Sequence, residues 1–204
     1  MRCTFSGHYL PCVAYFQEIY HHTTDVVHLW SNEPYVKQSY RNRAYVLGPH
    51  RVEMLILPVH APQGILMQDV TLDNHERWAI NHWRTIETAY RKSPFFEHYE
   101  PFLNPLFHQR NEWLLAFQAD LMKMLLRLLG IKRTLMFAGK GEINPTEYLH
   151  PKRQEDWPIL VPYRQNFGDQ WVPNLSILDL LFMQGPNAKE ILRNGQPKCH
   201  FLQK

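Results

Sequence analysis

The alternation of apolar and polar residues predicts strands in the first third of the chain. Residues 25–30, with the sequence DVVHLW, are typical of a short strand. The apolar runs at 43–48 and 52–59 flank a Gly-Pro-His turn, which predicts two paired strands. Residues 65–72 are a further strand candidate. One helix is also expected in this region, at residues 11–22, because a proline opens that segment.

A helical spacing of apolar residues predicts longer helices in the rest of the chain. Residues 74–92 carry apolar side chains on one face of an amphipathic helix, which ends before Pro94. Residues 110–130 are apolar around most of the helix circumference, which indicates a buried helix closed by a glycine. A strand at 133–138 and an apolar helix at 173–185 follow.

Together these elements predict one α/β domain. A mixed sheet from the N-terminal third is expected to pack against helices from the C-terminal two thirds, with residues 1–193 forming the domain. A length of 204 residues suits a single hydrophobic core. Residues 139–158 are polar and rich in turn residues, so we interpret them as a long loop, either a lid or a disordered segment. Residues 194–204 are expected to be a frayed tail.

Charge, cysteine content and the absence of known motifs limit the partners, compartments and cofactors that the sequence suggests. The net charge of +3 is too small for a protein that coats nucleic acid by charge alone, so nucleic acid is not the expected partner. Cys3, Cys12 and Cys199 form no CxxC pair, and such an odd, sparse set is typical of a reducing compartment. The sequence contains no recognisable signal peptide and no apolar run of about 18 residues, so we expect a cytoplasmic protein without a membrane span. Walker A, GxGxxG, GxSxG and HExxH motifs are absent, and the sequence therefore indicates neither a cofactor nor a metal site.

The segment 36–43, VKQSYRNR, concentrates cations, amides and a tyrosine between two apolar runs. If it continues as a strand into residues 43–48, one face carries Tyr35, Lys37, Ser39, Arg41, Arg43 and Tyr45. Arg41 and Arg43 would then lie about 7 Å apart, a spacing suited to neighbouring phosphates. Gln38 and Asn42 would share the opposite face, where amides can bind hydroxyls or base edges. An exposed strand edge protected by cations is an equally open alternative.

A histidine and an aspartate on predicted helices are further candidates. His75 and His82 would lie about 10 Å apart on one helix face, too far to share a zinc ion. His82 could act as a general acid or base, or it could have a structural role in the helix. Asp179 lies in an apolar run and needs a partner, for which one of the two arginines is a candidate. The spacing Ser176-x-x-Asp179 favours a helix cap instead.

Four segments of the sequence resemble the WbqC-like family of bacterial proteins. They are YLPCVAYF, EPYVKQSYRNR, NHWRTIETAYRKSPFFEHY and PNLSILDLLFMQGP, in the order of the family, and they extend from Tyr9 to about Pro186. The family is associated with gene clusters for O-antigen and other surface polysaccharides, so the resemblance implies a role in polysaccharide synthesis. One departure lies at His28-Leu29-Trp30, where many relatives carry an aspartate. If that aspartate is catalytic, the resemblance implies an altered or inactive chain.

The pattern and the resemblance together indicate a cationic, aromatic site. The catalytic candidates are His82, Lys37 and Tyr90. The substrate-binding candidates are Tyr9, Gln38, Arg41, Asn42, Arg43, Lys92, Asn174 and Asp179. Such a site suits an anionic, polyhydroxylated ligand, and the resemblance makes a nucleotide-activated sugar the simplest candidate. The resemblance implies no particular reaction; an amine acceptor on the sugar would make the protein an acyl or aminoacyl transferase. An RNA-binding protein and a non-catalytic, partner-binding protein are the alternatives.

Overall fold

The computed structural model describes residues 3–75, 77–141, 143–147, 149–153 and 157–198. Strands and helices alternate along the chain and share one hydrophobic core, which confirms the predicted α/β class. The strands are divided between a parallel sheet and two antiparallel pairs, and they do not form the single mixed sheet that we expected.

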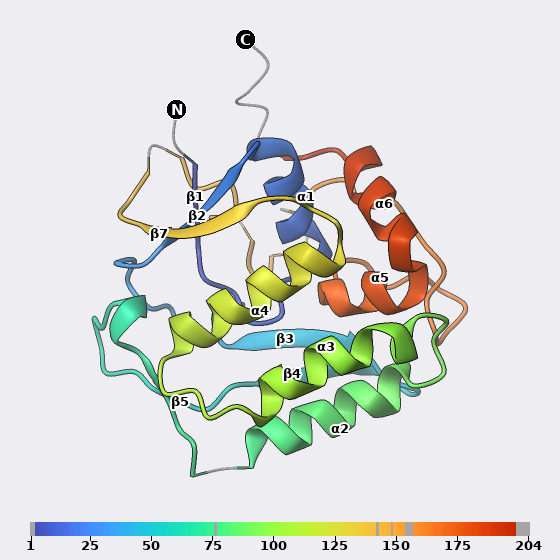
Figure 1. The fold of residues 1–204 in the computed structure, drawn as a ribbon, viewed down its shortest axis with the longest axis horizontal. Helices are drawn as coiled ribbons and strands as arrows, with labels where there is room; N and C mark the ends of the chain where they lie inside the picture. Colours follow the sequence, from blue (N-terminus) through green and yellow to red (C-terminus); the bar gives the residue numbers. More distant parts are fainter. Residues whose placement is uncertain (1–2, 76, 142, 148, 154–156, 199–204) are drawn as a thin grey trace.

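The parallel sheet joins segments that lie far apart in the sequence. β1 (Thr4–Phe5), β2 (Val26–Trp30) and β7 (Thr134–Ala138) pair in the order β1-β2-β7. α1 (Val13–His22) connects β1 to β2, because parallel neighbours need a crossover connection (Figure 1). Since the three strands run in the same direction, the segments that follow them emerge at one edge of the sheet.

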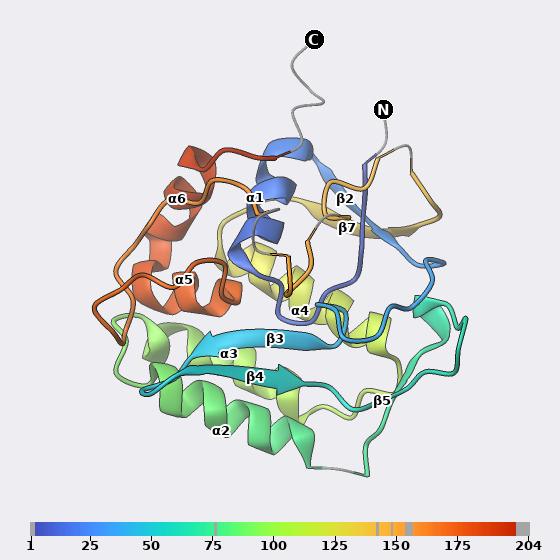
Figure 2. The same ribbon diagram turned by 180° about the vertical axis from the view of Figure 1, so that it is seen from behind.

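The hairpin of β3 (Arg43–Leu47) and β4 (Val52–Ile56) confirms the predicted strand pair. The two strands lie side by side in Figure 2, below the parallel sheet. Along β3 the period of two buries Ala44 and Val46 in the core and leaves Tyr45 on the opposite face. Tyr45 and this opposite face of the hairpin line part of the candidate site.

A second antiparallel pair, β5 (Val59–His60) with β6 (Thr71–Leu72), is much shorter. The strand predicted at 65–72 is therefore wrong over most of its length. Residues Met67–Asp69 form a 3-10 helix, and the backbone amide of Met67 donates to the carbonyl of Glu33 at 2.9 Å. The backbone of this segment is thus bound to the loop after β2.

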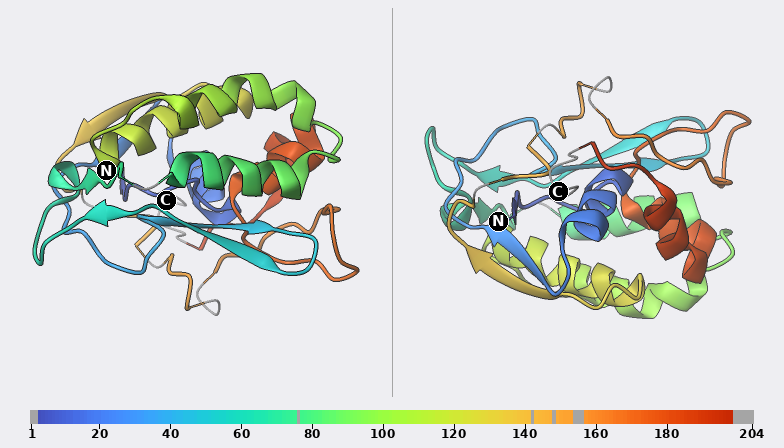
Figure 3. Two further views of the ribbon diagram at one scale, coloured as in Figure 1. Left: turned by 90° about the horizontal axis from the view of Figure 1, so that it is seen from below. Right: turned by 90° about the horizontal axis from the view of Figure 1, so that it is seen from above.

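Three helices pack on one side of the hairpin: α2 (Trp78–Tyr90), α3 (Phe96–His108) and α4 (Leu114–Leu128) (Figure 3, left). α2 and α4 confirm the amphipathic and the buried helix that the sequence predicts. α3 escapes prediction because Pro101 and Pro105 lie inside it, and proline removes a backbone donor from a helix interior. Both prolines are exposed, whereas the opposite face of α3 joins the core.

The last helices, α5 (Ile177–Gln184) and α6 (Ala188–Asn194), complete the core. α5 confirms the predicted apolar helix, which ends at a glycine as expected. The described residues after α6, predicted to be frayed, are instead held in place. The amide of Gln196 donates to the carbonyl of Ile159 at 3.1 Å, and that of Lys198 donates to Glu18 Oε1 at 2.9 Å. The remainder of the predicted tail, 199–204, lies outside the described residues.

The described residues between 139 and 175 form a long loop, as the sequence predicts for its first half. Isolated bridges, such as the one between Cys3 and Ile143, are its regular pairings among the described residues. Figure 3 shows that this loop runs on the side of the hairpin away from α2. It therefore covers the face of β3 that carries Tyr45.

Candidate functional site

A polar cavity lies where β1 and β2 end. Ligands of α/β proteins commonly bind beyond the carboxyl ends of parallel strands, where loops supply side chains. Here the loops after β1 and β2 meet the long loop around a cavity of about 160 Å³. We call it the polar cavity, and its lining includes Ser6, His8, Trp30, Glu33, Arg41, Asn144, Thr146, Glu147 and Leu149.

Glu33 organises one wall of the polar cavity. Its carboxylate is 1% exposed and accepts hydrogen bonds from Ser6 Oγ at 2.9 Å and from the amide of Gly7 at 3.2 Å. It also forms an ion pair with Arg41 Nη2 at 2.7 Å. A buried carboxylate with three donors is well satisfied, so Glu33 fixes the position of the Arg41 guanidinium. Arg41 Nε remains without a hydrogen-bond partner.

The other polar groups of this cavity form a second network. Asn144 Nδ2 donates to Ser6 Oγ at 2.9 Å, and Thr146 Oγ1 donates to Asn144 Oδ1 at 2.8 Å. His8 is buried, and its Nδ1 has no hydrogen-bond partner among the residues that the structure describes. Burial, and then the nearby charge of Arg41, hold the pKa of His8 well below its usual range. The cavity therefore presents hydroxyl, amide and carboxylate groups beside a neutral imidazole.

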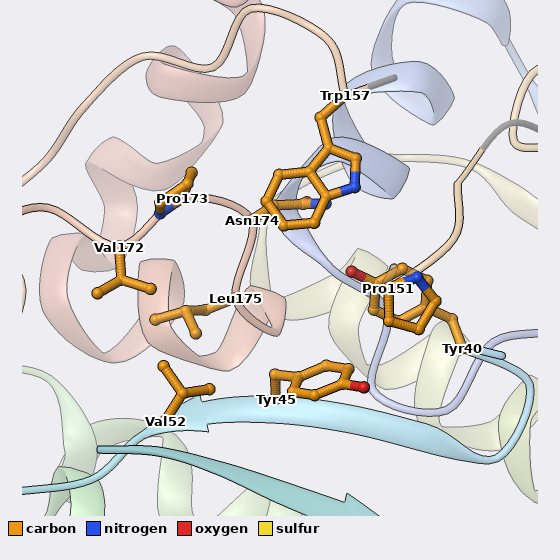
Figure 4. A pocket seen from close by; sticks show the side chains of 9 residues that line it. All are labelled: Tyr40, Tyr45, Val52, Pro151, Trp157, Val172, Pro173, Asn174 and Leu175. Atoms are coloured by element: carbon orange, nitrogen blue, oxygen red, sulfur yellow. The ribbon is translucent and has the colours of Figure 1, made fainter. Parts of the chain in front are cut away.

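An aromatic cavity of about 290 Å³ lies between the outer face of β3 and the long loop (Figure 4). Its lining residues are Tyr40, Tyr45, Val52, Pro151, Trp157, Val172, Pro173, Asn174 and Leu175. In Figure 4 the ring of Trp157 stands across the cavity from Tyr45, while Pro151 and Tyr40 close one end. Trp157 Nε1 and Asn174 Nδ2 are buried donors for which the described part of the chain offers no hydrogen-bond partner. Unsatisfied buried donors are rare in folded proteins, and they are suited to receive a ligand acceptor.

Four cations lie around His150, whose chain neighbours Leu149 and Pro151 line the polar and the aromatic cavity. Burial lowers the pKa of His150 most, and the charges of Arg153, Lys152, Arg41 and Arg43 lower it further. We call these four cations the cationic cluster. Arg43 Nε is buried without a hydrogen-bond partner, and no ion pair of Arg43 occurs among the described residues.

The segment VKQSYRNR contributes only part of what its pattern predicts. Residues 36–42 form a turn and the strand begins at Arg43, so the continuous strand face is wrong. Gln38 has a left-handed φ of 59°, which breaks the period of two. The turn nevertheless places Arg41 in the lining of the polar cavity, and Gln38 Oε1 accepts a hydrogen bond from Lys152 Nζ at 3.2 Å. Lys37 is exposed on the same turn.

Three other candidates point into the core on the far side of the hairpin. Asn42 Nδ2 donates to the carbonyl of Leu57 at 3.1 Å. The hydroxyl of Tyr9 bonds to Nδ1 of His82 at 2.9 Å, and both side chains are buried. Burial lowers the pKa of His82 to about 4, although a hydrogen bond with the backbone of Ile56 opposes this effect. His82 is not among the described residues that line either cavity.

Asp179 and Tyr90 belong to a buried polar cluster below α5. Asp179 Oδ2 accepts hydrogen bonds from the Tyr163 hydroxyl at 2.8 Å and from Gln165 Nε2 at 3.0 Å. Burial raises the pKa of Asp179, and the hydrogen bonds from its neighbours oppose the shift. The hydroxyl of Tyr90 accepts from the amide of Leu47 at 3.1 Å. Among the described residues, Asp179 therefore binds Tyr163 and Gln165 and not the arginine that the sequence suggested, and its carboxylate does not cap α5.

Ser176 alone caps α5, because its Oγ accepts from the amide of Leu178 at 3.4 Å. Asn174 lines the aromatic cavity, and its Oδ1 accepts from the amide of Ala14 at 3.0 Å. Lys92 is exposed beyond the end of α2, where it lines a different hollow with Phe167. The eleven candidates thus do not form one site.

Several lining residues were not among the candidates. Ser6 and His8 follow β1, whose two residues are too few for a recognisable strand pattern. Glu33 lies three residues after the predicted strand at 25–30, and that position was the available signal for it. Trp157 and His150 lie in the polar loop, where the sequence pattern assigns no contacts. Among the described residues, no group of three or more His, Cys, Asp or Glu side chains is placed to hold a metal ion.

Comparisons with known proteins support the resemblance. The profile of the WbqC-like protein family matches residues 7–147 and 147–191. The uncharacterized protein Rv1507c of Mycobacterium tuberculosis is 25% identical over 223 residues, which cover 92% of this chain and 95% of that protein. No solved structure gives a significant match. Over the part of the chain that the structure describes, no helix is long and apolar enough to cross a membrane.

Proposed function

Because the chain belongs to the WbqC-like protein family, we propose that it is an enzyme of bacterial surface-polysaccharide synthesis that acts on a nucleotide-activated sugar. The reaction class that fits best is transfer of a group, such as an acyl or aminoacyl group, onto the sugar. The proposal starts from the association of the family with polysaccharide gene clusters. For this chain it is carried by Arg43, whose buried Nε has no hydrogen-bond partner among the described residues and which lies on the same face of β3 as Tyr45 of the aromatic cavity.

The cationic cluster suits the diphosphate of such a ligand. Guanidinium groups bind phosphate oxygens through two parallel hydrogen bonds and stay charged at all physiological pH values. Arg43 has a buried Nε without a partner, and its charge is not neutralised by an ion pair among the described residues. A diphosphate would supply both the missing acceptors and the missing negative charge.

The aromatic cavity suits the nucleobase. Stacking of a base on an aromatic side chain contributes about 1–3 kcal/mol and accepts any base. Tyr45 and Trp157 face the cavity from opposite sides, which leaves room for a flat ring between them (Figure 4). The unpaired donors of Trp157 and Asn174 match the carbonyl and ring-nitrogen acceptors on the edge of a base.

The proposal changes the roles of the candidates. Gln38, Arg41, Arg43 and Asn174 remain binding residues, and Lys37 is an exposed cation on the turn that carries them. Tyr9, Asn42, His82, Tyr90 and Asp179 support the fold, because each is buried and hydrogen-bonded within the core. A His82 pKa of about 4 also makes this residue a weak base at neutral pH.

A thermal-shift panel tests the proposal. It contains UDP-glucose, GDP-mannose and dTDP-glucose, each with its nucleoside diphosphate, and tRNA. A ligand at 100 times its dissociation constant adds about 2.7 kcal/mol of stability, which raises the melting temperature by about 5–10 °C for a chain of this size. We expect a shift with at least one nucleotide-sugar, and its loss in Arg43→Ala.

Arg84→Ala is the matched control, because Arg84 is an exposed arginine on α2 and its removal changes the net charge equally. This variant should keep the full shift. If no nucleotide-sugar shifts the melting temperature, or if Arg43→Ala and Arg84→Ala behave alike, the proposal is wrong. A shift with tRNA alone, falling steeply with salt, would favour the RNA-binding alternative.

A further inference from the structure

We propose that the polar cavity is the sugar subsite of this protein, with the nucleobase in the aromatic cavity and the diphosphate on the cationic cluster between them. This inference rests on the proposed function and assigns each end of the ligand to a place. It also gives a role to the carboxyl edge of the parallel sheet, which none of the sequence candidates except Arg41 reaches.

At two places, residues that are neighbours or near neighbours in the sequence line the two different cavities, and we call this boundary the wall. Tyr40 lines the aromatic cavity and its chain neighbour Arg41 lines the polar cavity. On the long loop, Leu149 lines the polar cavity and Pro151 the aromatic cavity, with His150 between them. Consecutive Cα atoms lie about 3.8 Å apart, so a ligand crossing this wall needs only a short linker.

The residues at this wall match the chemistry of a diphosphate linker. Arg41 of the cationic cluster lines the polar cavity, and Arg43 of the same cluster lies two positions from Tyr45 on the same face of β3. The order along the site is therefore aromatic, cationic and then polar. A nucleotide-sugar has the same order of parts, with a base, a diphosphate and a polyhydroxylated ring.

The lining of the polar cavity favours a sugar over a second phosphate. Hydroxyl, amide and carboxylate groups from Ser6, Asn144, Thr146 and Glu147 can each bond to a sugar hydroxyl. Trp30 adds an apolar ring surface of the kind that packs against sugar rings. The carboxylates of Glu33 and Glu147 would repel a further anion, and Glu33 already neutralises Arg41.

Isothermal titration of three ligands distinguishes the subsites. The ligands are each nucleotide-sugar of the panel, its nucleoside diphosphate and its sugar 1-phosphate, and the variants are Asn144→Ala and Trp157→Ala. We expect Asn144→Ala to lower the affinity for the nucleotide-sugar and for the sugar 1-phosphate about tenfold, which is the loss expected from one good hydrogen bond. The affinity for the nucleoside diphosphate should change by no more than about twofold. Trp157→Ala should lower the affinity for the nucleoside diphosphate and for the nucleotide-sugar, and leave the affinity for the sugar 1-phosphate unchanged.

Glu147→Gln provides a second test, because Glu147 is exposed and its replacement does not disturb the bonds of Asn144. It should act on the same ligands as Asn144→Ala, with a smaller effect. Two outcomes would overturn the subsite assignment, provided that Arg43→Ala abolishes binding. In the first, both variants lower the affinity for the nucleoside diphosphate as much as that for the nucleotide-sugar. In the second, both variants leave the affinities for all three ligands unchanged. The proposed function would survive either result. If Arg43→Ala also binds like the wild type, both proposals fail.

Discussion

Glu33→Gln is the substitution with the largest expected effect among the residues of the candidate site. The carboxylate of Glu33 receives three hydrogen bonds, one of them from the charged Arg41. Glutamine has nearly the same shape but replaces one acceptor oxygen by a donor. Whichever way the amide is turned, its NH₂ group faces a donor, which is the Gly7 amide in one orientation and Ser6 with Arg41 in the other.

The expected loss of stability is about 3 kcal/mol. Removing one partner of a buried ion pair typically costs about 3–5 kcal/mol, because the other charge stays buried without compensation. The Arg41 side chain is 15% exposed, so water offsets part of that cost and we take the lower end. For a chain of this size, about 3 kcal/mol lowers the melting temperature by about 6–12 °C.

Urea denaturation followed by circular dichroism measures this loss, and a second glutamate–arginine pair provides the control. Glu53 Oε1 lies 3.0 Å from Arg51 Nε on the hairpin, where the Arg51 side chain is 77% exposed. Exposed pairs contribute little, so Glu53→Gln should leave the midpoint unchanged. If Glu33→Gln loses less than about 1 kcal/mol, or no more than Glu53→Gln, the argument from burial is refuted.

Three further predictions concern the core. Burial raises the pKa of Asp179 in the folded state. The contribution of this residue to the free energy of unfolding is therefore complete below its unfolded pKa of about 3.9, and it is lost as the pH rises through the folded pKa. Asp179→Asn should remove this loss from urea midpoints measured across that pH range. Gly185→Ala places a Cβ 2.6 Å from the ring of Phe95 at a φ of 53°, and should lower the stability to urea by about 1–3 kcal/mol. Tyr9→Phe removes the hydrogen bond to His82 and should cost about 1–2 kcal/mol in the same assay, without lowering the affinity for a nucleotide-sugar.

Each of these has an outcome that would contradict it. A pH dependence of stability that is identical in wild type and Asp179→Asn would mean that Asp179 titrates normally. A fully stable Gly185→Ala variant would show that Phe95 can move aside. A Tyr9→Phe variant that folds like the wild type but no longer binds would return Tyr9 and His82 to the site.

Local patterns were sufficient for most of the elements. The hairpin of β3 and β4 and the helices α2, α4 and α5 follow from apolar periodicity and from turn residues next to them. α3 was missed because proline usually marks the end of a helix, whereas here both prolines occupy its solvent face. β1 was missed because two residues carry no periodicity, and its place is set by pairing with β2.

The site could be predicted only in part, for a related reason. Arg41 and Arg43 were found because two cations lie close together in the sequence. Ser6, Glu33 and Asn144 meet only through the tertiary fold, across chain separations that no local pattern records. Conversely, His82 and Asp179 suggested chemistry because polar residues in apolar helices look exceptional, yet each is hydrogen-bonded to a residue from another segment of the core.

The parallel sheet has a consequence for how the protein is made. β2 can pair with its second neighbour only when Thr134–Ala138 of β7 have left the ribosome. Likewise, the hydrogen bond from the amide of Ala14 to Asn174 Oδ1 can form only after Asn174 has been synthesised. Contacts of such long range form late, since the closure of a large loop precedes any gain from them. At about 5–20 residues per second of synthesis, the N-terminal strands therefore spend seconds without their partners. Both cavities are assembled from segments at the two ends of this interval, so a nascent chain acquires the cavities only together with its final fold.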